Sequence, residues 1–519
     1  MNLRILFLAL TLAASAGFAQ TPYPGNDADH GVANGSRFIA PYTGNVAFST
    51  SDLAVAGAVG MYGLRWQRHA TSRTPQAEPL FGLAHNWTHS YQYEMVDAGS
   101  DKEGRRMLSF RAPLGAEERF TQTSTGAWNG SPSMRYILAA KGDDFVVTAT
   151  NGNQSRFTRA RTARGDVFTL RERVDPEGNI WAFAWIDGRL SQVTEPAGRW
   201  LKISYTSLAA PGGAKGAPPF TVISEVNASD GQRVAYHYEF PDGADYPVLT
   251  RVDYPDGTQA SYKYATPRPA GRLLLAQAID PHGDRNLRGR MFHYRSEADA
   301  AHGQLLEIRA AEGGAIIQSL AADGRTLRGY AVGESNGATV YRTYHPGGNL
   351  VEEVDAIGFA RMHEYDAEGR GFKTAVTDEL GHVTRFENDV QGRRVKVTFP
   401  DGAVRSWQRD TNGRVIVETD ELRHQRILTR DAKGRVVKVQ HPDGAAEEMT
   451  YNEFGQIASR TDRVGAITTS TYDRRGLRTK ITNALGTFIS FAYDAQDRLI
   501  ATTDPRSNTT AMSVIQPAG

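Results

Sequence analysis

The sequence Tyr451-Asn452-Glu-Phe-Gly455-Gln456 returns 21 residues later as Tyr472-Asp473-Arg-Arg-Gly476-Leu477, and this repetition decides the fold. The unit opens with Tyr-Asp-x-x-Gly-Arg or a variant of it, and continues with a β-rich run, a second turn and a second β-rich run. The Asp or Asn column falls at positions 366, 389, 410, 431, 452, 473 and 494, so the first step is 23 residues and every later step is 21. A fixed period of this length is typical of repeat architectures, in which each copy is one supersecondary unit.

Each copy has the features of a β-hairpin. Asp or Asn starts a turn because its short side chain bonds to backbone groups two residues on, and Gly three positions later accepts a positive φ. Asp497 takes the place of this Gly in the seventh copy, and Asp also tolerates the left-handed region. Val395, Val397 and Phe399 alternate with polar residues, which puts one face of a strand in a core and the other in water. We therefore predict an all-β fold made of antiparallel hairpins.

The seven copies in residues 365–505 resemble the YD repeats of the RHS family, which occur in bacterial Rhs proteins, in teneurins and in the BC components of Tc insecticidal toxins. The resemblance implies an extended antiparallel β-hairpin sheet that coils as a YD/RHS-type spiral. The Tyr that opens the unit is lost at Asn388, Arg409 and Arg430. We expect these copies to stack less well, because an aromatic ladder between neighbouring strands is weakened there.

The remaining chain is arranged around these repeats. Turn signals such as Tyr254-Pro255-Asp256-Gly257 separate short strand-like runs in the middle region, which indicates further hairpins. The last residues have few strand signals, and we expect a frayed end. The predicted segments are a signal peptide at 1–19, an N-terminal β-rich module at 20–130, a degenerate β-repeat region at 131–360, the regular repeats at 361–505 and a C-terminal tail at 506–519.

The N-terminus has the pattern of a secretory signal peptide. Arg4 precedes the apolar run Ile5–Ala14, and Gly17-Phe18-Ala19 follows as the expected cleavage site, so the mature chain is predicted to begin at Gln20. The alternative is a buried N-terminal helix or a membrane anchor, but the run is shorter than the ~18 residues that a spanning helix needs. We predict an exported protein that is secreted, periplasmic or at the cell surface.

Composition agrees with an exported all-β protein. The 52 Gly and 23 Pro residues suffice for many turns, and the chain has no Cys, which excludes disulfides and thiolate metal sites. The net charge of +1 gives no electrostatic reason to expect a nucleic acid or an anionic lipid as partner.

Residues 41–120 are similar to the domain that often precedes RHS repeats. Arg68 and Ser72 fit the family pattern, whereas Ala70 stands where a Tyr is usual and Ala84 where a second Gly is usual. The match rests mostly on Phe81-Gly82, Trp87 and Tyr91. The resemblance implies no catalytic role for this domain, so it carries over no active site.

No catalytic, cofactor-binding or metal-binding residue is predicted. His85 and His89 are four residues apart, but no Glu follows the first His, so the zinc-protease motif is absent. The pair His363-Glu364 lacks a second His. Asp366 and Glu368 lack the ligand number and spacing of a calcium loop, and turn formation explains them better. Because Cys, the Gly-x-Ser-x-Gly elbow and a Walker loop are also missing, we expect a non-enzymatic protein without cofactors.

RHS proteins that release a toxin usually carry, after the repeats, a segment with an Asp-Pro-x-Gly-Leu-type self-cleavage motif. The Asp-Pro-x-Gly runs at Asp175 and Asp280 lie early in this chain and continue differently, so we interpret them as turns. The resemblance therefore covers the N-terminal and repeat portion of the family.

The family resemblance implies an exported, non-enzymatic β-repeat scaffold related to RHS toxin-encapsulating shells, acting in protein–protein interaction or toxin delivery. One alternative is a cell-surface adhesin that binds carbohydrate, with Trp407 and Tyr451 as candidate platforms. Another is a hydrolase in residues 41–130, which would require a pocket with paired acids or a His pair.

The expected sheet is too small to enclose a folded toxin. Residues 131–505 supply roughly 36 strands if each strand with its turn takes about 10 residues, which makes an incomplete shell the expected form. Such a shell has an open terminal strand, which we expect near Phe488–Tyr493 or Ile500–Thr503. An open edge favours strand addition, so a protein partner or self-association is predicted at the C-terminal edge.

Overall fold

The computed structural model describes most of the chain between residues 39 and 512. The predicted signal peptide, its cleavage site, His85 and the turn at Asp497 lie outside the described residues. The described residues are 39–40, 45–55, 63–71, 83, 87–113, 117–130, 136–149, 152–162, 165–176, 178–209, 219–242, 244, 246–265, 273–280, 290–294, 305–309, 315–320, 326–332, 339–344, 349–355, 357–368, 371–390, 392–411, 413–494 and 499–512.

All regular elements in these ranges are strands, which confirms the predicted all-β fold. Two small four-stranded antiparallel sheets come first, with the strand orders β1-β2-β3-β4 and β5-β6-β7-β8. We call these two sheets the opening module. Its strands are β1 (Ile39–Ala40), β2 (Asn45–Ala54), β3 (Arg65–Thr71), β4 (Trp87–His89), β5 (Glu94–Ser100), β6 (Arg106–Arg111), β7 (Glu117–Gln122) and β8 (Trp128–Asn129).

The rest of the chain forms one antiparallel ribbon in which each strand pairs with the strand before it and the strand after it, from β9 to β41. We call β9–β25 the first half of this ribbon. Its strands are β9 (Tyr136–Lys141), β10 (Asp144–Ala149), β11 (Gln154–Thr162), β12 (Gly165–Val174), β13 (Ile180–Ile186), β14 (Arg189–Thr194), β15 (Trp200–Leu208), β16 (Phe220–Ala228), β17 (Arg233–Glu239), β18 (Val248–Asp253), β19 (Gln259–Ala265), β20 (Leu274–Ile279), β21 (Arg290–Tyr294), β22 (Leu305–Arg309), β23 (Ala315–Leu320), β24 (Thr326–Val332) and β25 (Thr339–Tyr344).

The second half of the ribbon holds the regular repeats, two strands per copy. Its strands are β26 (Leu350–Val354), β27 (Ala360–Tyr365), β28 (Lys373–Thr377), β29 (Val383–Asn388), β30 (Arg394–Thr398), β31 (Val404–Arg409), β32 (Val415–Thr419), β33 (Gln425–Arg430), β34 (Val436–Gln440), β35 (Ala446–Tyr451), β36 (Ile457–Thr461), β37 (Ile467–Tyr472), β38 (Arg478–Thr482), β39 (Phe488–Tyr493), β40 (Leu499–Thr503) and β41 (Thr509–Ala511).

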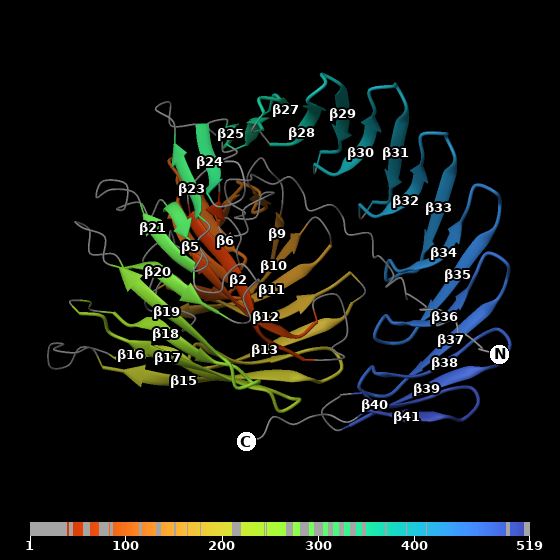
Figure 1. Ribbon diagram of the computed structural model, residues 1–519, viewed down its shortest axis with the longest axis horizontal. Coiled ribbons are helices and arrows are strands. Elements are labelled where there is room, and N and C mark those ends of the chain that lie inside the picture. Colours follow the sequence, from red (N-terminus) through yellow and green to blue (C-terminus); the bar gives the residue numbers. More distant parts are fainter. Residues whose placement is uncertain are drawn as a thin grey trace.

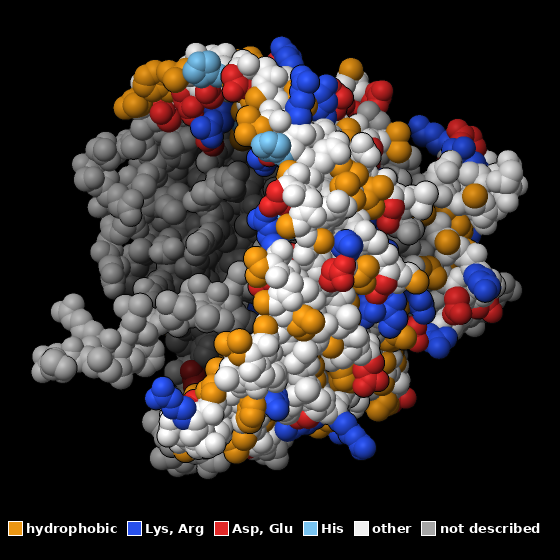
Figure 2. All heavy atoms as spheres, turned by 90° about the vertical axis from the view of Figure 1, so that its right-hand side faces the viewer, with side chains coloured by type: hydrophobic (Ala, Val, Ile, Leu, Met, Phe, Trp, Pro, Cys, Tyr) orange, Lys and Arg blue, Asp and Glu red, His pale blue; other side chains and the backbone are white. Residues whose placement is uncertain are grey.

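The ribbon curves around the opening module. Figure 1 shows β2, β5 and β6 inside the curve, with the first half of the ribbon around them and the second half continuing the arc on the other side. β9 pairs with β10 and β41 pairs with β40, and within the described residues no register joins β41 to β9. The outer side of the second half, seen in Figure 2, is mostly uncharged polar surface with scattered hydrophobic and charged side chains.

A β-bulge at the position of the repeat Tyr occurs in the regular copies and also in the first half of the ribbon. Each residue at the position of the repeat Tyr sits at a β-bulge, as between Thr450 and Tyr451. The same bulge occurs in the first half of the ribbon, for example at Tyr205, Tyr238 and Tyr264. The region that the sequence identifies only as degenerate repeats thus contains the same hairpins, with longer and less regular connections between them.

The residue at the bulge donates a hydrogen bond to the backbone carbonyl 15 residues earlier. Tyr451 reaches the carbonyl of Val436 at 2.6 Å, and Tyr472 reaches that of Ile457 at 2.8 Å. In the copies without Tyr, Nδ2 of Asn388, Nη2 of Arg409 and Nη2 of Arg430 each donate to the equivalent carbonyl, all at 3.0 Å. The ring is lost in these copies, but the hydrogen bond that closes the hairpin is kept.

Two sequence-based expectations about the C-terminal end are wrong. β39 (Phe488–Tyr493) pairs with β38 and β40, and β40 (Leu499–Thr503) pairs with β39 and β41, so neither strand is the open edge. The last strand, β41, lies inside the segment that was expected to fray. It forms because Asp504 starts one more turn, in which its carboxylate accepts the amide hydrogens of Arg506 and Asn508.

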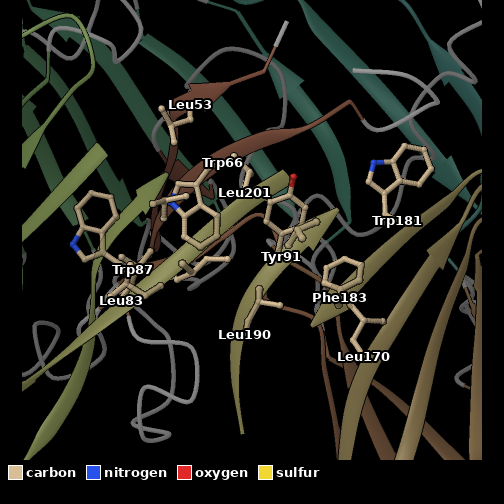
Figure 3. Packing of buried hydrophobic residues seen from close by; sticks show 14 of the residues in the cluster. Leu53, Trp66, Leu83, Trp87, Tyr91, Leu170, Trp181, Phe183, Leu190 and Leu201 are labelled. Atoms are coloured by element: carbon tan, nitrogen blue, oxygen red, sulfur yellow. The ribbon is translucent and has the colours of Figure 1, made fainter. Parts of the chain in front are cut away.

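The main hydrophobic core lies between the opening module and the first half of the ribbon. Figure 3 shows Trp66, Tyr91 and Phe183 within this core, and the ring centroids of Trp66 and Phe183 are each 5.9 Å from that of Tyr91. The buried cluster extends along the ribbon as far as Ala278. The indole of Trp181 donates to the carbonyl of Gly63 at 3.1 Å, which ties the ribbon to the module.

Candidate functional site: a buried arginine cluster and an uncovered repeat face

Arg68 is the centre of a charged cluster between the module and the ribbon. It lies on β3, is completely buried, and donates from Nε to Oδ2 of Asp52 on β2 at 2.6 Å. Its two terminal nitrogens donate to the hydroxyls of Tyr262 at 3.0 Å and Tyr254 at 2.9 Å, both from the ribbon. The guanidinium carbon is 5.0 Å from the ring centroid of Trp87, an arrangement that adds a cation–π attraction.

A second carboxylate completes the cluster. Asp280 accepts hydrogen bonds from Tyr254 at 2.8 and 2.9 Å and from Tyr262 at 2.6 Å, and it lies 3.5 Å from Nη2 of Arg68. Tyr236 donates to Asp52 at 2.5 Å. The buried guanidinium of Arg68 therefore lies between a carboxylate of the module, Asp52, and a carboxylate of the ribbon, Asp280. Three tyrosine hydroxyls of the ribbon donate hydrogen bonds to these two carboxylates.

Burial controls the protonation of this cluster. Loss of solvent raises the pKa of Asp52 above its ordinary value, against the charge and hydrogen bond of Arg68. Burial alone lowers the pKa of Arg68, but the charge of Asp52 and the neighbouring tyrosines outweigh it and leave this pKa well above the ordinary value. Burial also raises the pKa of Tyr236 and Tyr262, so their hydroxyls remain donors at neutral pH.

The arrangement fixes the module in the ribbon. Hydroxyl, carboxylate and guanidinium groups of the module and the ribbon hydrogen-bond to one another. Removing one partner of a buried ion pair typically costs about 3–5 kcal/mol. Sequence reasoning used Arg68 only as a point of family resemblance and interpreted Asp280 as a turn residue. The sequence alone could not show that these residues lie close together in space, because Arg68 and Tyr262 are 194 residues apart in the chain.

The histidines and acids considered as candidates have structural positions. His89 is buried and its ring stacks on Trp66 with 4.5 Å between centroids. Burial lowers the pKa of His363 to about 4, which keeps this ring neutral. Asp366 accepts the amide hydrogen of Phe372 at 2.8 Å, as a turn residue does. Among the described residues, no group of three or more His, Asp or Glu side chains is placed to hold a metal ion.

The carbohydrate candidates are engaged within the sheet. Trp407 is half-buried and its indole lies 3.3 Å from Oε1 of Glu418, and the hydroxyl of Tyr451 is used in its own hairpin. Neither ring forms an exposed platform of the kind that sugar stacking requires.

A second feature is a column of residues on the concave face of the ribbon. Tyr236 and Tyr262 stand two residues before a bulge residue, and both face the opening module. Because side chains alternate along a strand, the residues two before the bulge in the regular repeats point to the same side. In chain order they are His363, Phe386, Trp407, Leu428, Met449, Ser470 and Phe491, and all but His363 and Ser470 are apolar.

The opening module does not pack against this concave column, because the main hydrophobic cluster ends at Ala278. Leu428 is buried, and Phe386, Trp407, Met449 and Phe491 are of intermediate exposure, each beside an exposed neighbour on the outer face, such as Gln408 beside Trp407. The main hydrophobic cluster joins the module only to the first half of the ribbon. The second half thus presents the same kind of inner face without the module against it.

Comparisons with known proteins agree with the repeat assignment. The RHS Repeat family model matches residues 451–487 and 472–509. The crystal structure of TcdB2-TccC3 is similar over 87% of this chain and 26% of its own, with 12% identity and a TM-score of 0.43. A Tc holotoxin pore of Photorhabdus luminescens is similar over 87% of this chain and 27% of its own, with 11% identity and a TM-score of 0.30.

This chain spans about a quarter of the length of those two structures. A search of curated proteins found no match. The described residues contain no helix long and apolar enough to cross a membrane. The C-terminal hairpins of this chain, residues 451–509, are RHS repeats.

Proposed function

We propose that this protein is an exported, non-enzymatic β-repeat scaffold that holds a polypeptide partner against the concave face of its second half. The observation that carries the proposal is the column of Phe386, Trp407, Leu428, Met449 and Phe491. In the first half, the equivalent column is covered by a folded β-sheet module. The second half has an inner face of the same character without the module against it, and we expect this face to receive another polypeptide in the place that the module takes in the first half.

The mass of the native particle tests this proposal. The full chain is isolated from its natural producer and measured by size-exclusion chromatography with multi-angle light scattering. We expect a mass above that of the 56.8 kDa chain and a second polypeptide in the peak. Trp407→Glu, which places a charge on the concave face, should remove the second polypeptide, whereas Gln408→Glu on the outer face of the same strand should not.

A monomer without a second polypeptide, or equal retention by both variants, would refute the concave face as the binding surface. Far-UV circular dichroism of both variants serves as the control for folding.

Export is the second part of the proposal, and it is supported by the sequence of residues 1–19. We expect protein recovered from outside the cytoplasm to begin at Gln20, as read by N-terminal sequencing. Recovery with Met1 intact would contradict it.

The edge of β41 offers a further contact for a partner. All three of its residues, Thr509 to Ala511, are exposed, and within the described chain it pairs only with β40. An unpaired strand edge favours strand addition by another chain. This edge replaces the two strands that the sequence suggested for the same role.

A further inference from the structure

One rim of the second half carries aliphatic side chains that the fold does not use. They occupy the third position of the second turn of the repeats, the turn that joins β26 to β27, β28 to β29 and so on along the ribbon. Their exposed fractions are 79% for Ile357, 77% for Leu380, 76% for Leu422, 88% for Val464 and 88% for Leu485.

Turn formation does not require an apolar residue at this position. In the turn at Asp378, the carboxylate accepts the amide hydrogens of Leu380 at 3.0 Å and His382 at 2.8 Å, so the backbone is held while the Leu380 side chain projects outward. Equivalent turns carry Asp401 or Asp443 in the same place with the same backbone hydrogen bonds. The aliphatic residues therefore contribute little to folding, and they need another explanation.

The repeat geometry sets the spacing of these side chains. Successive tips are separated by one hairpin, which is two strands or about 10 Å along the rim. All these turns connect the strands at the same rim, because each copy adds one complete hairpin to the ribbon. The result is a line of apolar tips with a regular period, interrupted where Asp401 and Asp443 take the tip position.

The charge of the rim selects among possible occupants. The turns 355–358, 378–381, 399–402, 420–423, 441–444, 462–465 and 483–486 contain eight acidic residues and two arginines. Three of these acidic residues, Glu379, Glu421 and Asp443, are engaged in ion pairs with arginines. The other five outnumber the one remaining arginine of these turns, so an excess of negative charge remains. Pairing with the same rim of a second copy would bring like charges together, and an anionic membrane would be repelled.

We propose that this acidic, apolar rim binds a polypeptide partner that presents apolar side chains at multiples of about 10 Å, with lysine or arginine between them. The apolar tips supply the contact area and the acidic residues select the charge of the partner. The rim is a different surface from the concave face, so the two sites can be occupied independently.

A designed peptide tests the proposal on the intact protein. The probe is a fluorescent 22-residue amphipathic peptide with leucine at every seventh position, which spaces the leucines about 10.5 Å apart in a helix, and with lysine between them. Fluorescence anisotropy at physiological salt gives the dissociation constant. The matching peptide with glutamate in place of lysine should bind at least tenfold more weakly.

The variant Val464→Ser/Leu485→Ser should weaken binding of the lysine peptide at least tenfold. Val390→Ser is the matched control, because Val390 is 66% exposed on the opposite rim and should be dispensable. Unchanged thermal unfolding of both variants would show that they fold.

Three outcomes would overturn the proposal. One is equal binding by the wild type and both variants. The second is a wild-type dimer in light scattering that the double variant converts to a monomer, which would identify a second copy as the occupant. The third is flotation of the wild type, but not of the double variant, with phosphatidylcholine vesicles, which would identify a lipid surface.

Discussion

The glycine of the repeat turn lies beneath a side chain of the preceding copy. Gly434 has a φ of +87°, and a Cβ placed there would lie 1.8 Å from Nη1 of Arg414. Gly444, in the other turn of the next hairpin, has a similar φ of +85° but nothing within 4 Å of its Cβ position. Gly434 is therefore required both for its positive φ and for the close approach of Arg414 from the preceding copy, whereas Gly444 is required only for its positive φ.

Substitutions at Gly434 and Gly444 distinguish the cost of backbone strain from the cost of a clash with Arg414. We expect Gly434→Val to destabilise the repeats by about 1–3 kcal/mol through strain at positive φ, with displacement of Arg414 in addition. Gly434→Ala should cost more than Gly444→Ala, because only the former meets a guanidinium. Urea unfolding midpoints measure the difference, and equal costs would contradict the packing role of Arg414.

The residue at the bulge is predicted to matter as a hydrogen-bond donor and not as an aromatic ring. Arg430→Leu removes the donor to the partly buried carbonyl of Val415 and should destabilise by about 1–3 kcal/mol, because this acceptor is left unsatisfied. Arg430→Tyr restores the donor that other copies use and should be close to neutral in thermal unfolding. A tyrosine variant as unstable as the leucine variant would refute this equivalence.

Arg68 provides the strongest single-residue test of the buried cluster. Arg68→Met leaves Asp52 and Asp280 buried without their cation and should cost about 3–5 kcal/mol in denaturant unfolding. Lys396→Met, which removes an exposed pair with Glu387, should change stability by at most about 1 kcal/mol. A small effect of Arg68→Met would mean that the cluster does not hold the module in place.

The loss in Arg68→Met should also depend on pH. The pKa of Asp52 is raised in the folded protein, so its contribution to stability is complete below the unfolded pKa and is lost as the pH rises through the folded value. Without Arg68 this pKa rises further, and the charged form becomes more costly. The destabilisation relative to wild type should therefore be larger at pH 8 than at pH 5, and the opposite trend would contradict the assignment.

At the scale of elements, hairpins with a 21-residue period were predictable because turn chemistry and alternation are local properties. The positive φ at Gly392, Gly413 and Gly434 confirms the turn assignment. The hairpins of the first half do not show the regular 21-residue period in the sequence, because insertions such as residues 209–219 change the spacing between their bulges. Arg68 with Asp280 could not be found at all, since their pairing depends on how the ribbon curves around the module.

The sequence did not predict β41 as the terminal strand because its strand signals are weak, although Asp504 provides the turn before it.

The open edge of β41 allows a prediction about strand addition. The amide hydrogen of Met512 is donated to the carbonyl of Ile500, so alternation places the amide of Ala511 on the outer edge. Ala511→Pro should preserve the fold but weaken any association at this edge, whereas Thr510→Val should not, as measured by light scattering. Equal association in both variants would exclude strand addition there.

At the scale of the whole molecule, one ribbon has two different environments. The first half encloses the opening module, joined to it by a hydrophobic cluster and by the Arg68 cluster. The second half continues the same curve in Figure 1, and its concave column is partly buried without the module against it. We expect the concave face of the second half, against which the module does not pack, to hold a polypeptide partner.

The most direct measurement is site-specific photo-crosslinking in the natural producer. A photoreactive phenylalanine analogue replaces Trp407 on the concave face or Gln408 on the outer face of β31, and the products are analysed by mass spectrometry. We expect a covalent adduct with one polypeptide from position 407 and none from position 408. No adduct at position 407, or an equal yield from both positions, would contradict it.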